Sequence, residues 1–164
     1  MDLLGELFRH NTMMNRQLAE ACRPLSPEQL GATVDGTYGS IAATLVHIAN
    51  SQVGYAARLL DIPRLESLPE DPFPGFETLT ARFAIGDSQL EGAAQSPPDR
   101  DVEVTGDDPV GTWRMPVSLF LVQAINHGTE HRSQVATILT QLGIEPPEMD
   151  GWAYFDASGQ LIPV

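Results

Sequence analysis

Apolar residues recur at intervals of three and four in four segments of the chain, the spacing that places them on one face of a helix. The first segment carries on that face Leu3, Leu4, Leu7, Asn11, Met14, Leu18 and Ala21. We expect this helix to end near Arg23, because the residue before a proline avoids helical backbone angles. Residues 26–28 favour a short helical turn. A second helix is predicted from its N-cap Ser40 to about Leu60, before the next proline.

The third and fourth helices follow the same pattern. The third presents on one face Phe76, Leu79, Phe83, Leu90 and Ala93. Gly86 weakens it by about 1 kcal/mol relative to alanine. The fourth is predicted to begin near Pro116, a favourable first-turn residue, and to run to Leu142 with Gly143 as its stop. Aromatic residues near the helix ends are expected to cover one end of the helices: Trp113, Trp152 and Tyr154.

The connections between these helices differ in kind. Residues 62–76 contain four prolines, which indicates a long crossover after the second helix rather than a tight turn. Polar and apolar residues alternate over 101–105, and a turn-rich segment at 106–109 leads into 110–115. This alternation predicts a small hairpin before the fourth helix. The pattern as a whole predicts an all-α fold, a four-helix bundle that occupies residues 1–164 as a single domain.

Composition narrows the classes of partner. Hydrophobic residues make up 42% of the 164 residues, enough for a packed core. The net charge is -13, with 9 basic and 22 acidic residues. This balance disfavours nucleic acid and anionic membrane surfaces, which attract clusters of lysine and arginine. We therefore expect neither nucleic acid nor a membrane as a partner.

The N-terminus and the cysteine content bear on location. The first residues include acidic side chains where a signal peptide needs basic ones. Cys22 is the one cysteine, so no intramolecular disulfide forms, which fits a reducing compartment. These features favour a cytoplasmic location.

Two of the predicted helices lack the charged residues that a solvent-exposed helix face would carry. Residues 40–57 and 115–129 contain no Asp, Glu, Lys or Arg. Helices of this kind are covered nearly all round, by neighbouring helices or by a partner subunit. We expect a homodimer for this reason.

Three histidines fall in or beside these uncharged stretches. His127 and His131 are one helical turn apart, a spacing at which both imidazoles can reach one ion. His47 lies on a stripe of small residues that leaves room beside its ring: Ser40, Ala43, Ser51 and Gly54. The alternative for each histidine alone is a core residue satisfied by one hydrogen bond. Three buried histidines without an ion would be costly, so a three-histidine metal site is the preferred interpretation.

Longer motifs resemble the DinB family, and the resemblance covers about residues 3–154. The motifs that carry it are Asn11-x-x-x-Asn15, Gly39-Ser40-Ile41 leading into Leu45-Val46-His47-Ile48, and His127-x-x-x-His131-Arg132-x-Gln134. Met13 departs from the family pattern, which often has an aromatic residue there. The resemblance implies an up-down-down-up bundle and a divalent metal held by His47, His127 and His131. Zinc and nickel are the first expectations for that metal, with iron and manganese as alternatives.

Other polar residues are candidates for a second layer around the histidines. Ligating histidines usually donate their second ring N–H to an oxygen. Candidates for that layer are Asn11, Asn15, Asn50, Glu130 and Gln134. Tyr38 and Tyr55 are candidates to line the pocket. Arg132 is a candidate for binding an anionic substrate, with an ion pair to a neighbouring acid as the alternative.

Two classes of function remain open from the sequence. Three protein ligands leave positions for water or substrate, which favours a metal-dependent enzyme. Relatives in the wider superfamily use low-molecular-weight thiols, so the resemblance implies a transferase that joins such a thiol to a small electrophile. Metal-assisted hydrolysis is the second choice within this class. A metal-binding or stress-associated protein without turnover is the alternative, favoured by the lack of a convincing base beside the histidines.

Overall fold

The computed structural model of the protein describes residues 2–105 and 111–162, which form six helices and one two-stranded sheet. The long helices are α1 (Leu3–Cys22), α3 (Ile41–Leu60), α4 (Phe76–Gln95) and α5 (Leu119–Gln141). The short ones are α2 (Pro27–Leu30) and α6 (Gly151–Ala157), and the strands are β1 (Asp101–Thr105) and β2 (Thr112–Pro116). The prediction of a mostly helical chain is confirmed. No helix among these residues is both long and apolar enough to cross a bilayer.

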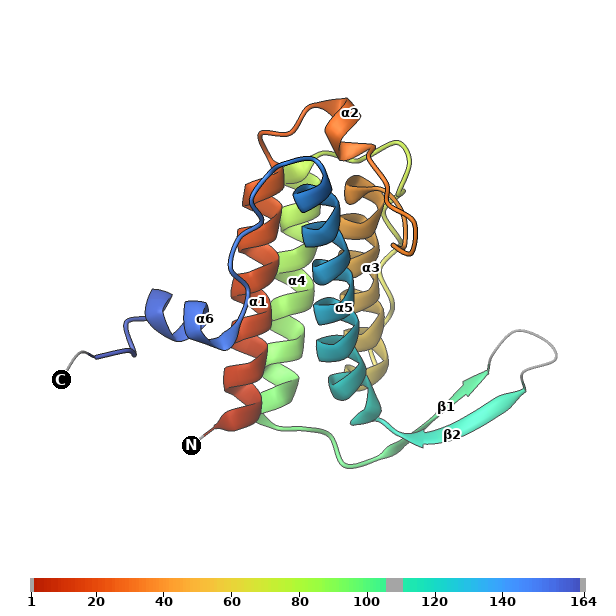
Figure 1. The fold of residues 1–164 in the computed structure, drawn as a ribbon. Coiled ribbons are helices and arrows are strands. Elements are labelled where there is room, and N and C mark those ends of the chain that lie inside the picture. The colour runs from red at the N-terminus through yellow and green to blue at the C-terminus, as the bar shows by residue number, and fades with distance from the viewer. Residues whose placement is uncertain (1, 106–110, 163–164) are drawn as a thin grey trace.

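The four long helices lie side by side (Figure 1). Helix α3 packs against α4 and α5, and α1 packs against α4 and more sparsely against α5. In Figure 1, α3 and α4 both start at the end of the molecule where α1 finishes, and α5 returns in the direction of α1. The segment between α3 and α4 therefore has to span the length of these helices.

Asn50 on α3 holds this crossover in place. Its Nδ2 donates to the carbonyl of Leu68 at 2.9 Å, and its Oδ1 accepts from the Leu68 N–H at 2.9 Å. These two bonds satisfy both backbone groups of one residue in a segment that has no regular structure of its own. The middle of the crossover is thereby fixed against α3.

The helix ends follow the predicted signals with one exception. Ser40 caps α3 by accepting from the N–H of Ala43, and Gly143 takes a φ of +73° just after α5. Helix α5, however, begins at Leu119 and not near Pro116. Pro116 is instead the last residue of β2, where it pairs with Asp101. The strand pairing of the hairpin thus includes the residue that was predicted to begin the helix. The predicted turn at 106–109 lies outside the described residues.

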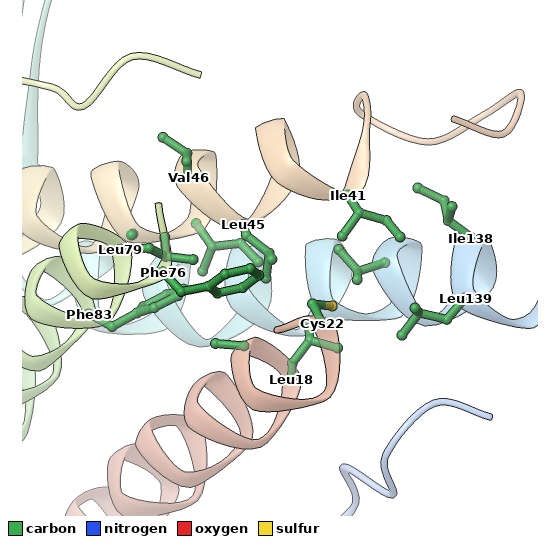
Figure 2. Packing of buried hydrophobic residues seen from close by; sticks show 14 residues of the cluster. Leu18, Cys22, Ile41, Leu45, Val46, Phe76, Leu79, Phe83, Ile138 and Leu139 are labelled. Carbon is green, nitrogen blue, oxygen red and sulfur yellow. The ribbon is translucent and has the colours of Figure 1, made fainter. Parts of the chain in front are cut away.

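Two clusters of buried side chains form the core. One draws on all four long helices: Leu18, Ala19, Cys22, Ile41, Leu45, Val46, Ile48, Ala49, Phe76, Leu79, Phe83, Val135, Ile138 and Leu139. Figure 2 shows how these side chains converge from the four helices. The other contains Phe8, Ala56, Leu59, Leu90, Ala93, Ala94, Val117, Phe120, Leu121 and Ala124. Gly86 lies at a close crossing of α4 with α3, where a Cβ would stand 3.1 Å from that of Gln52. The glycine that weakens α4 is what permits this approach.

The aromatic residues near the helix ends divide into two groups. Tyr154 on α6 is buried and contacts His10 of α1 edge-on. Trp152 and Trp113 are 76% and 56% exposed, so the prediction that they cover an end of the helices is wrong. Trp113 lies on the hairpin, which projects away from the four helices in Figure 1. Helix α6 therefore packs on the rest of the protein through the face that carries Tyr154, and Trp152 on the same helix stays exposed.

Candidate metal centre

The three histidines come together between α3 and α5. His127 and His131 lie on successive turns of α5, and His47 faces them from α3. One ring nitrogen from each histidine lies within 4.8 Å of the others. The ring centroids are 4.9 Å apart for His47 and His127, 4.8 Å for His47 and His131, and 4.3 Å for His127 and His131. Helix packing thus places residues 80 positions apart in one cluster.

One pair of nitrogens has a spacing that fits a shared metal ion. The Nε2 atoms of His47 and His127 are 3.0 Å apart. Two imidazole nitrogens bound to one ion at about 2.0–2.1 Å, at angles near 90–110°, stand roughly 3.0–3.4 Å apart. A hydrogen bond between the two rings gives a similar distance, since one Nε2–H can donate to the other nitrogen. The donor set of three imidazoles is compatible with a divalent ion.

Gln134 sets the orientation of His131. Its Oε1 accepts from the backbone N–H of Tyr38 at 3.0 Å and lies 2.9 Å from Nδ1 of His131. A backbone N–H can only donate, so the Gln134 atom is the oxygen and His131 Nδ1 must carry the hydrogen. The lone pair of His131 is then on Nε2. Gln134, a sequence candidate for the layer around the histidines, thus contacts one of them.

Glu70 and Tyr38 close over His47. The ring of Tyr38 stacks on that of His47, with centroids 3.9 Å apart and planes inclined by 25°. Its hydroxyl donates to the Glu70 carboxylate, and Glu70 Oε1 lies 3.5 Å from His47 Nδ1. Sequence reasoning missed Glu70, because a residue of the irregular crossover belongs to no periodic pattern. Only its place near a run of prolines on a long connection marked the segment as unusual.

The environment keeps two of the imidazoles neutral. Burial is the main cause that lowers the pKa of His127 to about 4, and the neighbouring His131 and His47 lower it further. Burial also lowers the pKa of His47, an effect that His131 adds to and Glu70 opposes. Neutral imidazole is the form that binds a metal. His47 and His127 are therefore in the form that could bind a cation at neutral pH.

We predict that His127 titrates near pH 4 in the metal-free protein. Its folded pKa lies below the unfolded value of about 6.5, so the unfolded chain takes up the proton first as the pH falls. His127 thus makes the fold less stable as the pH drops from about 6.5 to 4, and has no such effect above 6.5. An NMR titration of the imidazole Cε1–H measures the midpoint. A midpoint at or above 6.5 would contradict the burial that the structure shows.

Asn11, Asn15 and Arg132 form a separate buried network instead of a layer around the histidines. Arg132 Nη1 donates to Oδ1 of Asn11 and of Asn15, each at 2.7 Å. Asn15 Nδ2 in turn donates to Asp87 Oδ1 at 3.1 Å, and Gln52 Nε2 donates to the same oxygen at 2.9 Å. We name these five residues the arginine network. Arg132 is 3% exposed, so it does not face solvent where an anionic substrate would approach. Asp87 is the carboxylate that acts on it electrostatically, without an ion-pair contact among the described residues.

Asp87 is the second residue that sequence reasoning missed. It is 7% exposed, and this burial is the first cause that raises its pKa to about 6. Hydrogen bonds from Gln52 and Asn15 act in the opposite direction. The sequence does contain a signal for it, because Asp87 follows Phe83 by four positions and precedes Leu90 by three, which places it on the apolar face of α4.

The remaining candidates lie at various distances from the histidines. Tyr55 contacts the edge of His127, with ring centroids 5.6 Å apart. Asn50 binds the crossover at Leu68, as described above. Glu130 is exposed on α5. Among these candidates, Gln134, Tyr38 and Tyr55 thus contact a histidine.

Comparison with known proteins gives a family and a fold. The model of the DinB family matches residues 1–161. A crystal structure of a DinB-like protein from Bacillus cereus ATCC 10987 matches with a TM-score of 0.64 and 19% identity, over 88% of this chain and 94% of that chain. No curated protein matches the chain.

Proposed function

Since the chain belongs to the DinB family, we propose that it binds one divalent metal through His47, His127 and His131 and acts as a metal-dependent transferase. The observation that carries the proposal is the convergence of three imidazole nitrogens within 4.8 Å. We propose zinc or nickel as the metal, with iron and manganese as alternatives, because imidazole suits several of these ions. We also propose that residues 1–164 form one domain, an up-down-down-up bundle. The parallel course of α3 and α4 in Figure 1 supports this topology.

The proposed reaction joins a low-molecular-weight thiol to a small electrophile. A metal bound by three neutral ligands keeps open positions and an uncompensated positive charge, which lower the pKa of a bound thiol. In the reaction the thiol loses its proton to solvent, a sulfur–carbon bond forms, and the electrophile releases its leaving group. Tyr38 and Tyr55 supply apolar ring surface beside the histidines on which a small substrate can pack.

The protein itself does not offer the thiol. Cys22 is fully buried in the core, and burial raises its pKa to about 12. A second molecule must therefore bring the sulfur. Glu70 is a negative charge beside His47, and Arg132 is bound within the arginine network and cannot offset it. These charges favour a thiol with little negative charge over a strongly anionic one.

The test is a panel of thiols of different charge with one reporter electrophile. We expect turnover by the metal-loaded wild type with at least one neutral thiol, and no turnover by His127→Ala. Rates equal to the metal-free control for every thiol, with no thiol changing the spectrum of the bound metal, would favour the metal-binding protein without turnover. Hydrolysis of the electrophile without thiol incorporation would favour the hydrolase.

We further propose a cytoplasmic homodimer. The uncharged stretch of α5 supports the dimer, because Leu119 and Val122 leave 42% and 64% of their surfaces exposed in the single chain. Apolar side chains on an uncharged helix face are typical of surfaces that another subunit covers. Sedimentation at micromolar concentration measures the state, and a species near 17.8 kDa alone would contradict the dimer.

A further inference from the structure

The two ring nitrogens of His47 face different groups. Nε2 lies 3.0 Å from Nε2 of His127, inside the cluster. Nδ1 lies 3.5 Å from Oε1 of Glu70, within ion-pair distance but longer than the usual 2.7–3.2 Å of an N–H···O hydrogen bond. The carboxylate is thus at the side of the ring that points away from the other histidines. A carboxylate is an acceptor only, so this placement favours the tautomer with the hydrogen on Nδ1 and the lone pair on Nε2.

Glu70 is itself held in position. The Tyr38 hydroxyl donates to both of its oxygens, at 3.0 and 3.2 Å. Tyr38 is fixed in turn by its stacking on His47 and by its backbone N–H, which donates to Gln134. The segment before α3 and the crossover before α4 therefore meet over the ring of His47. A side chain restrained in this way differs from an acid that is merely near a histidine on the surface.

The arrangement around His47 parallels the one around His131. His131 donates its Nδ1–H to the oxygen of Gln134, and His47 has the oxygen of Glu70 at the equivalent nitrogen. Both rings then direct Nε2 to the same space. The difference is charge, because a carboxylate also raises the basicity of the ring that donates to it.

The position of Glu70 excludes a direct role in moving a proton at the open metal position. An imidazole ring separates the carboxylate from the cluster, since Glu70 contacts Nδ1 and the cluster lies at Nε2. A general base must come within hydrogen-bond reach of the proton that it takes. The contact that Glu70 makes with the cluster therefore runs through the ring of His47.

We propose that Glu70 is a positioning residue, which holds His47 with Nε2 toward the metal and strengthens it as a ligand, and that Tyr38 holds Glu70 for this task. This inference rests on the proposed metal binding by the three histidines. It assigns a function to two loop residues that lie outside the helices carrying the ligands.

Metal affinity of Glu70→Gln tests the proposal. The substitution keeps the size of the side chain and removes its charge. We expect the Kd for Zn²⁺, measured by competition with a chromophoric chelator, to rise about 10- to 100-fold, the usual effect of changing a partner of a ligating histidine. Tyr38→Phe keeps the stacked ring and loses the hydroxyl, so a smaller rise is expected. Combining the two substitutions should add little beyond Glu70→Gln, because both act on one contact.

Glu66→Gln is the matched control. Glu66 is an exposed acid on the same crossover. Its substitution by glutamine removes one negative charge and leaves the residues around His47 unchanged. Its Kd should stay within about twofold of the wild type. Thermal melting of all variants checks that the fold is intact, which we expect because Glu70 lies on the surface of the crossover.

A second measurement separates this proposal from metal binding itself. Nitrogen-15 NMR of the metal-free protein reports which nitrogen of His47 carries the hydrogen. We expect the Nδ1–H form in the wild type and a shift toward the Nε2–H form in Glu70→Ala, which leaves no oxygen to accept from Nδ1. If the wild type binds no Zn²⁺ while this tautomer change is seen, the proposed function fails and the role of Glu70 in orienting the ring stands. If Zn²⁺ binds equally to the wild type, to Glu70→Gln and to Glu70→Ala, the positioning role fails and the proposed function stands.

Discussion

His131→Ala is expected to lose stoichiometric metal. The substitution leaves two imidazoles, and it also removes the ring that Gln134 orients. Changing only an outer partner of a ligand weakens metal binding about 10- to 100-fold, so losing the ligand itself should exceed about 100-fold. Elemental analysis after dialysis against metal-free buffer measures the effect. We expect about one ion per chain in the wild type and none in the variant.

His10→Ala provides the control for this experiment. His10 lies on α1, where its Nε2 contacts the carbonyl of Met149 at 3.1 Å, outside the three-histidine cluster. The His10→Ala variant should bind as much metal as the wild type. Equal binding would show that the loss of metal depends on which histidine is removed and not on the number of histidines. Full retention of metal by the variant with alanine at His47, His127 and His131 would refute the site.

Asn15→Leu is expected to lower the free energy of unfolding by about 3–5 kcal/mol, the cost of breaking a buried charged network. Asn15 is the residue through which the Arg132 guanidinium and the Asp87 carboxylate are joined. Leucine has a similar volume but can neither accept from the one nor donate to the other. Two buried charged groups then lose hydrogen bonds that water cannot replace. Urea denaturation followed by circular dichroism measures the change.

The pH dependence of this loss provides an internal check. Burial raises the pKa of Asp87 to about 6 in the fold, above its usual value of about 3.9, so its ionised form lowers stability as the pH rises through that range. The hydrogen bond from Asn15 favours the ionised form, so its removal should cost more above pH 6 than below it. Asn126→Leu, at an exposed position on α5, is the control and should change stability by less than about 0.5 kcal/mol. A loss of that small size in Asn15→Leu would mean that the arginine network does not stabilise the fold.

The helices could be predicted from the sequence because their signals are local. Ser40 and Gly143 mark ends that the structure confirms, since capping depends on the neighbouring residues of the same segment. Pro116 misled the prediction of the start of α5 because pairing with Asp101 in the hairpin overrides a weak local preference. A helix boundary predicted from local sequence is wrong where pairing with a residue distant in the sequence determines it.

The candidate site could be predicted only in part, for a related reason. The spacing of His127 and His131 and the following Gln134 lies within two turns of one helix, so the motif contains the geometry. Glu70 reaches His47 from an irregular crossover, and no pattern along the chain reports that contact. Asn15 was a candidate for the layer around the histidines, but its partner Arg132 could not be chosen over a histidine without the packing of α1 against α5.

The ligands lie on helices whose cores contain no metal. Leu45 and Ile48 flank His47 on α3, and Val135 and Ile138 follow His131 on α5, all of them buried in hydrophobic contacts. In a zinc finger the binding free energy is the folding free energy, so a chelator unfolds the domain. Here apolar packing and the arginine network order the backbone that carries the imidazoles, and neither contains a metal ligand. Removal of the proposed ion should therefore leave a folded apoprotein that can be refilled.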